Sequence, residues 1–228
     1  MTEQEWLACT DPREMLEALR ASGKASDRKL RLFACACCRL VWGSLIDQRS
    51  RGAVEVAERF ADGLAGRGEM DAARPAAEAA FVGAEDFYQG TVTSYGHFAV
   101  EQDECEAAEV AIASVARPVW PAVHALRGWV SFLRERKPRL LRDIFGPIPF
   151  RLVSTSPGWQ TPQVVALAQA AYDERELPAG TLDTTRLAVL ADALEEAGCV
   201  QADILGHLRG PGPHVRGCWA VDLLLGKE

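Results

Sequence analysis

Residues 26–46, SDRKLRLFACACCRLVWGSLI, constrain the fold of this chain more than any other stretch. Ser26 is a favourable N-cap, Asp27 suits a first helical turn, and neither Pro nor Gly occurs before Gly43. Apolar side chains recur at helical spacing and occupy most of the helix circumference. Because a helix of this kind packs against neighbours on several sides, we predict a central buried helix over 26–46.

The composition favours an all-α fold built around this helix. The chain has 228 residues, of which 48% are apolar and only 7% aromatic, and runs of β-branched residues are short. Residues 145–160 are rich in Pro, Gly and Ser and have no helical period, which is typical of a linker. We therefore predict an N-terminal helical bundle over 1–144, a linker over 145–160 and a smaller C-terminal helical unit over 161–228. Whether the two helical parts share one core stays open. Further helices are predicted over residues 12–22, 51–64, 70–88, 97–116, 118–137 and 202–208, after Pro162 and Asp183, and up to Leu225.

Charge and hydropathy restrict the class of protein. The formal net charge of −7 argues against nucleic-acid binding, because phosphate contacts need a basic surface. No stretch reaches the roughly 18 apolar residues that a membrane-spanning helix needs. The first residues lack the basic and apolar regions of a secretory signal. We expect a cytoplasmic protein without a membrane partner, and the sequence leaves the oligomeric state open.

Seven cysteines, an odd and irregularly spaced set, are expected to be reduced. Buried cysteines commonly pack as small apolar side chains, which is the simplest interpretation here. A zinc or iron site is the alternative. On a helix, Cys35 and Cys37 point about 160° apart, whereas Cys35 and Cys38 could share an ion. The spacing of His214 and Cys218 also suits metal ligation. The candidate ligands are Cys35, Cys38, Cys199, His207, His214 and Cys218.

A partner-binding surface is also predicted. The Pro/Gly-rich turn at 210–217 places His214, Arg216 and Trp219 together, and Arg and Trp frequently anchor protein interfaces.

The phosphate-loop, dinucleotide-binding, zinc-protease and nucleophile-elbow motifs are all missing from the sequence. We therefore expect a protein that is not an enzyme and needs no cofactor. The leading interpretation is a non-catalytic interaction or adaptor module with a protein partner, and the alternative is a small Cys/His metal-binding protein.

Three stretches resemble two known families. ASDRKLRLFACACCR, from Ala25, and PHVRGCWAVDLLLGK, from Pro213, resemble an uncharacterised family of bacterial proteins that share the FACACCR and PHVRGCW stretches. RLAVLADALEEAGC, from Arg186, resembles the short helical repeat-companion domain found beside leucine-rich repeats. The first resemblance supports the helical fold and the cytoplasmic location predicted above. It supplies no catalytic residue that could be assigned to this chain.

Cys35 is predicted to be the most reactive of the thiols. On a helix it lies one turn from both Arg31 and Arg39, whose positive charges favour the thiolate. A time course of alkylation in the folded protein, followed by mass spectrometry, should label Cys35 first. Labelling of Cys35 after the other cysteines would exclude this role.

Overall fold

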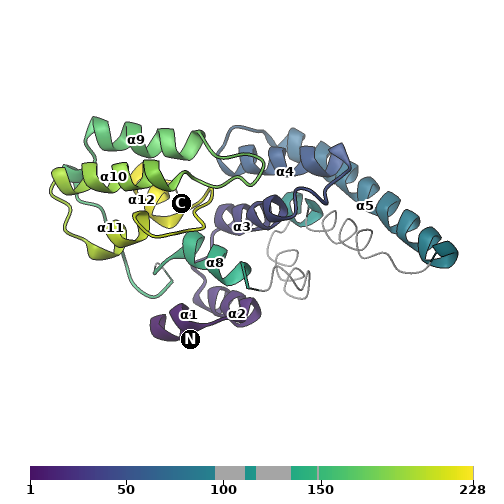
Figure 1. The fold of residues 1–228 in the computed structure, drawn as a ribbon, viewed down its shortest axis with the longest axis horizontal. Helices are drawn as coiled ribbons and strands as arrows, with labels where there is room; N and C mark the ends of the chain where they lie inside the picture. The colour runs from purple at the N-terminus through teal and green to yellow at the C-terminus, as the bar shows by residue number, and fades with distance from the viewer. Residues whose placement is uncertain (96–110, 117–134, 148, 228) are drawn as a thin grey trace. The chain divides into compact units, whose positions relative to one another are not determined.

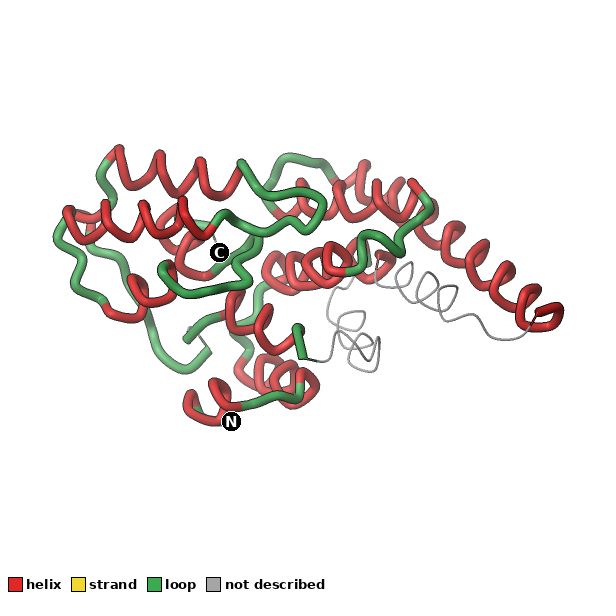
Figure 2. Tube along the Cα trace, viewed as in Figure 1, coloured by secondary structure: helices red, strands yellow, loops and turns green. Residues whose placement is uncertain are grey.

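The structure is a computed structural model that describes residues 1–95, 111–116, 135–147 and 149–227. These residues fold into helices and connecting loops (Figures 1 and 2). Their only β pairing is two isolated bridges, which join Thr181 to Glu176 and to Val215. The predicted all-α, multi-helix fold is therefore confirmed. The helices expected over 97–116 and 118–137 lie mostly outside the described residues. Within the described part of the chain, no helix combines the length and the apolar character needed to span a bilayer.

The chain divides into two compact units, which are described separately. One unit combines residues 1–25 with 136–228, and the other contains residues 26–135. The predicted linker at 145–160 lies inside the first of these units. Apart from Phe145, which is the last residue of an α-helix, its described residues contain only the short 3-10 helix η3 (Pro157–Trp159). The N-terminal residues thus belong with the C-terminal part of the chain, an association between distant segments that local sequence patterns do not report.

The described residues of the unit 26–135 include α3 (Asp27–Leu40), α4 (Gln48–Ala61) and α5 (Arg67–Tyr95), and residues 111–115 are also helical. Helix α4 packs against both α3 and α5. The Ser26 side chain caps α3 by accepting a hydrogen bond from the Lys29 backbone N–H, as the sequence predicts. Every residue from Lys29 to Arg39 is buried, which confirms the expectation of a buried helix.

Helix α3 is shorter than the predicted helix over 26–46. It ends at Leu40, and the chain continues in turns over residues 41–44. The Val41 and Ser44 backbone N–H groups donate to carbonyls three residues earlier, so the last carbonyls of the helix are satisfied by tight turns. Apolar spacing continues beyond the helix because Val41 and Leu45 are buried in their non-helical conformation.

The basic residues of α3 are buried and paired. Arg39 forms an ion pair with Glu58 of α4, with nitrogen–oxygen distances of 3.1 and 2.8 Å. The Arg39 guanidinium also lies 4.0 Å from the centre of the Trp42 ring. Arg31 donates to the Ser114 carbonyl at 2.5 Å. These charges therefore stabilise the packing of the unit, because each buried cation has an acceptor.

The other unit contains the two ends of the chain. Helices α1 (Glu3–Ala8) and α2 (Pro12–Ser22) precede α8 (Lys137–Phe145), which packs on α2 and α12 (Trp219–Leu225). Helices α9 (Pro162–Asp173), α10 (Thr184–Glu196) and α11 (Ala202–Leu208) complete it. Helix α9 contacts α10 and α12, and α11 contacts the same two helices. Their shared core includes Tyr172, Leu187, Leu194, Ile204 and Trp219.

Arg142 attaches α8 to the first residues of the chain. Its Nη1 donates to the Trp6 carbonyl at 3.3 Å and to the Cys9 carbonyl at 2.9 Å. Arg151 adds a second connection by pairing with Glu3. These hydrogen bonds satisfy carbonyls at the end of α1 and hold α1 beside α8.

Replacing Arg39 by Met is expected to lower the free energy of unfolding by about 3 kcal/mol, because the Glu58 carboxylate would be left buried without its cation. The double variant Arg39→Met, Glu58→Leu should recover most of this loss. Urea unfolding followed by circular dichroism measures both effects. As a control, Arg49→Gln removes an exposed pair with Asp47 and should leave stability nearly unchanged. Equal effects of Arg39→Met and Arg49→Gln would contradict the assigned role of the buried pair.

Candidate metal centre

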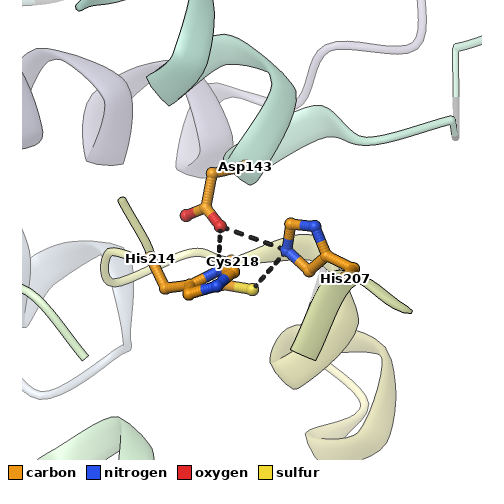
Figure 3. A group of neighbouring side chains, drawn as sticks. All are labelled: Asp143, His207, His214 and Cys218. Atoms are coloured by element: carbon orange, nitrogen blue, oxygen red, sulfur yellow. Dashed lines mark hydrogen bonds and ion pairs between the residues drawn. The ribbon is translucent and has the colours of Figure 1, made fainter. Parts of the chain in front are cut away.

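Four side chains with metal-binding donor atoms meet in the unit formed by the chain ends (Figure 3). Asp143 projects from α8 and His207 from α11. His214 and Cys218 come from the segment between α11 and α12. One ligand atom of each residue lies within 4.8 Å of the ligand atoms of the other three. We call these four residues the metal-ligand group.

The Asp143 carboxylate connects three segments of the unit. Its side chain is almost completely buried, and Oδ1 lies 2.8 Å from His214 Nδ1 and 3.1 Å from His207 Nε2. Its Oδ2 accepts a hydrogen bond from the Val215 backbone N–H at 2.8 Å. Burial opposes ionisation of this carboxyl, but the two histidines outweigh burial and lower the pKa of Asp143 below its ordinary value. A buried negative charge is therefore available at this position.

The two nitrogens of His214 face two acceptors. Nε2 lies 3.2 Å from the Gly210 carbonyl oxygen, so Nε2 must carry a proton to form this hydrogen bond. In the neutral ring, Nδ1 then presents its lone pair to the Asp143 carboxylate, which is repulsive. A proton on Nδ1 or a metal ion bound between the two atoms removes that repulsion. Burial opposes protonation, yet the hydrogen bond and the charge of Asp143 outweigh it and raise the pKa of His214.

His207 and Cys218 complete the metal-ligand group. His207 Nε2 lies 3.2 Å from Cys218 Sγ, and the Cys218 side chain is fully buried. The His207 ring packs edge-on against His214 and tilted against Trp219, with ring centres 4.8 and 5.1 Å apart. About a fifth of the His207 side chain is exposed, so this residue lies between the buried donors and the solvent.

Backbone contacts also hold the segment before α12 in place. The Leu182 backbone N–H donates to the His214 carbonyl at 2.8 Å. Gly212 has a φ of +75°, and a Cβ at this position would lie only 2.8 Å from the His214 nitrogen. Gly146, at the end of α8, has a φ of +51°, and a Cβ there would lie 2.5 Å from the Trp219 ring. Glycine is therefore required where the chain bends toward His214 and where α8 meets Trp219.

The donor set suits a tetrahedral metal ion. Zinc is bound by Cys sulfur at about 2.3 Å and by His nitrogen or carboxylate oxygen at about 2.0–2.2 Å, which places neighbouring ligand atoms about 3.3–3.6 Å apart. Three of the separations in the metal-ligand group are 2.8, 3.1 and 3.2 Å, and the longest is 4.8 Å. These values lie on both sides of the tetrahedral spacing. The His214 Nε2–H to Gly210 contact is also the type of outer hydrogen bond that orients ligating histidines.

No known family model, curated protein or solved structure matches this chain. The resemblance to a bacterial family and to the repeat-companion domain therefore stays a prediction. The chemistry of the site has to be argued from the residues themselves.

The structure brings together three of the six ligands predicted from the sequence: His207, His214 and Cys218. Cys199 is buried in the core formed by α9–α12 and is not part of the metal-ligand group. Cys35 and Cys38 belong to α3, in the other unit. Helical proximity of two thiols is thus a poor guide to ligation when no further donors converge on them.

Asp143 was not predicted as a ligand. It lies in a run, LRDIF, in which apolar residues flank a single acid, and it follows Arg139 and Arg142 in sequence. An acidic residue on the apolar side of a short helix is a signal for a buried, paired charge. The partner of that charge could not be read from the sequence, because it lies 71 residues away.

The three residues predicted to bind a partner differ in exposure. His214 and Trp219 are each only 3% exposed. Arg216 is partly exposed, and its guanidinium lies 5.1 Å from the centre of the Tyr172 ring. A partner could therefore reach Arg216 more readily than the other two residues. The predicted interface stays a prediction.

Cys35, predicted to be a reactive thiol, is 1% exposed and lies 3.9 Å from the Val54 carbonyl oxygen, to which its S–H donates. Burial also raises the pKa of the neighbouring Cys38 thiol well above its ordinary value. Labelling of Cys35 therefore requires local opening of α3 and α4, and its rank among the thiols stays a prediction.

Replacing Asp143 by Ala is expected to lower the free energy of unfolding of the metal-free protein by about 3 kcal/mol. The change leaves the Val215 N–H without its acceptor and removes the counter-charge of a buried His214. Urea unfolding in the presence of a chelator measures this loss. The matched control is Asp203→Ala, which removes an exposed carboxylate and should change stability by less than about 1 kcal/mol. Similar losses in the two variants would contradict a connecting role for Asp143.

Proposed function

We propose that this protein binds one metal ion through Asp143, His207, His214 and Cys218, and that this ion is zinc. The observation that carries the proposal is the convergence of four donor atoms within 4.8 Å from three separate segments. Two histidines, one thiol and one carboxylate are all established zinc ligands. The Gly210 carbonyl accepts a hydrogen bond from His214 Nε2–H. In this tautomer of the neutral ring, the Nδ1 lone pair is directed at the other members of the metal-ligand group.

Zinc is favoured over other metals by the mixture of ligand types. A thiolate among the ligands favours a softer ion than magnesium or calcium, which prefer oxygen ligands. Non-haem iron is typically held by two histidines and one carboxylate, with open positions for further ligands. Here a cysteine supplies a fourth donor, which suits a tetrahedral zinc ion. Ferrous iron is the alternative occupant.

The proposed role of the ion is structural. Four protein ligands complete a tetrahedral zinc site, whereas catalytic sites keep one position for water or substrate. The ligands would connect α8, α11 and the segment before α12, which are short elements with few internal hydrogen bonds. A metal bound to the folded state alone stabilises that state by mass action. This role agrees with the expectation of a non-catalytic module, and an interaction surface would then be presented by a metal-stabilised unit.

Protein prepared without chelator is expected to contain about one zinc ion per chain. Removal of the ion should lower the melting temperature, and zinc at about 100 times its dissociation constant should restore about 2.7 kcal/mol of stability. Substitution with Co²⁺ should give the near-ultraviolet charge-transfer band of a thiolate ligand and the visible spectrum of a tetrahedral ion. Metal analysis, calorimetry and absorption spectroscopy make these measurements.

Variants of single ligands test the site, and a variant of a cysteine outside the metal-ligand group is the control. Cys218→Ser should remove the thiolate band, and His207→Gln, which changes a partly exposed side chain, should weaken metal binding without preventing folding. Cys199→Ser replaces a buried thiol of the same unit outside the metal-ligand group, and should retain one metal per chain and the band. The proposal is excluded if zinc, cobalt and ferrous ions all fail to bind stoichiometrically. It is also excluded if binding is the same in His207→Gln, Cys218→Ser and the unmodified protein.

A further inference from the structure

A cavity of about 580 Å³ lies beside the metal-ligand group. It is enclosed by α1, by one side of α8 and by the Gly/Pro-rich segment 210–214, and the Trp219 ring and His207 contribute to its wall. All of these elements belong to the unit formed by the chain ends. Cavities of this size accommodate small organic molecules. Proline and tryptophan side chains provide apolar walls, so the charged groups of the lining determine which class of molecule fits.

The lining contains three arginines and the three carboxylates of Glu3, Asp143 and Asp203. Arg151 is neutralised by Glu3, at 3.0 Å, and by Asp203, at 2.7 Å. The Asp143 carboxylate is paired with His207 and His214. Arg139 and Arg142, one turn apart on α8, have no ion-pair partner among the described residues.

Arg142 is unusual because it is partly buried without a carboxylate. Its Nη1 donates to two backbone carbonyls, of Trp6 and Cys9, which leaves its other N–H donors available. An anion placed against the two guanidinium groups would supply the counter-charge that neither has among the described residues.

Trp6 supplies an unpaired donor in the same lining. The Trp6 side chain is 0% exposed, and its indole Nε1 has no hydrogen-bond acceptor in the described structure. Buried indole N–H groups normally find an acceptor, because an unsatisfied buried donor costs about 1–3 kcal/mol.

We propose that the cavity binds a small organic molecule that carries an oxyanion, a phosphate or a carboxylate. Arg139 and Arg142 supply the counter-charges, and the Trp219 ring packs on the apolar part of the molecule. Guanidinium groups bind oxyanions with paired, charge-assisted hydrogen bonds, which distinguishes them from general positive charge. Asp143, His207 and His214 also line the cavity, but the proposed anion contacts are made by Arg139 and Arg142, so the anion is expected to bind with and without the proposed metal.

Phenyl phosphate and benzoate are suitable probes, and benzamide is the neutral analogue. Each is titrated into the full chain in zinc-loaded and in metal-free form, by calorimetry and by ¹H–¹⁵N NMR of the tryptophan indole groups. We expect one of the two anions to bind in both forms and to shift the indole resonance that is missing in Trp6→Phe. Preference for phenyl phosphate identifies a phosphate ligand, and preference for benzoate a carboxylate ligand. Benzamide should bind at least tenfold more weakly.

The critical variant is Arg139→Gln, because Arg139 is exposed and its loss should not affect folding. It should weaken anion binding about tenfold, as expected for loss of a charge-assisted hydrogen bond. Arg142→Gln should weaken binding at least as much, provided that its circular dichroism spectrum is unchanged. Arg136→Gln, an exposed arginine at the start of the same helix that does not line the cavity, is the charge-matched control and should bind within twofold of the unmodified protein.

Three outcomes overturn the inference. The first is that neither anion binds, or that benzamide binds equally well. The second is that Arg139→Gln and Arg136→Gln have the same effect, which would indicate general electrostatic attraction. The third is that the anion binds only to the zinc-loaded protein and that Arg139→Gln does not change its affinity. This result would indicate that the anion is a ligand of the metal. Failure of zinc to bind, with anion binding retained, would exclude the proposed function and leave this inference intact.

Discussion

The Asp143 carboxylate is the interaction on which the unit formed by the chain ends depends. One oxygen is held by the Val215 N–H, and the other faces His207 and His214. A buried carboxylate is stable only when its charge is compensated, so α8, α11 and the segment before α12 must stay together for the unit to fold. The same requirement makes the position suitable for a cation, because a metal ion and a proton on His214 are alternative ways to satisfy the charge.

The unit of residues 26–135 follows the same principle with different residues. There, Arg39 and Glu58 join α3 to α4 in a region that is otherwise apolar. A pair of this kind adds little net stability compared with apolar residues, but either charge alone would strongly disfavour the fold. In both units a buried charge with a specific partner determines which helices pack together, and apolar contacts supply most of the stabilisation.

The site and the cavity show how neighbouring residues of one short helix serve different purposes. Asp143 points to the histidines, whereas Arg139 and Arg142 line the cavity and Arg142 also binds the carbonyls of α1. Placing α1 against α8 therefore has two results. It closes the cavity on one side, and it places residues of α1, among them Glu3 and Leu7, in the same lining as Arg139 and Arg142.

The sequence alone determined the helical class, the cap of α3 and the likeness of His207, His214 and Cys218 to metal ligands, because these depend on neighbours within a few residues. It extended α3 too far, since buried apolar spacing continues past Leu40 in turns. Only the tertiary structure brings Asp143 next to His207, His214 and Cys218 and places Cys199 outside this group. The reason is physical: Asp143 and His214 are 71 residues apart, and the packing of α8 and α12, which no local pattern encodes, sets the distance between them.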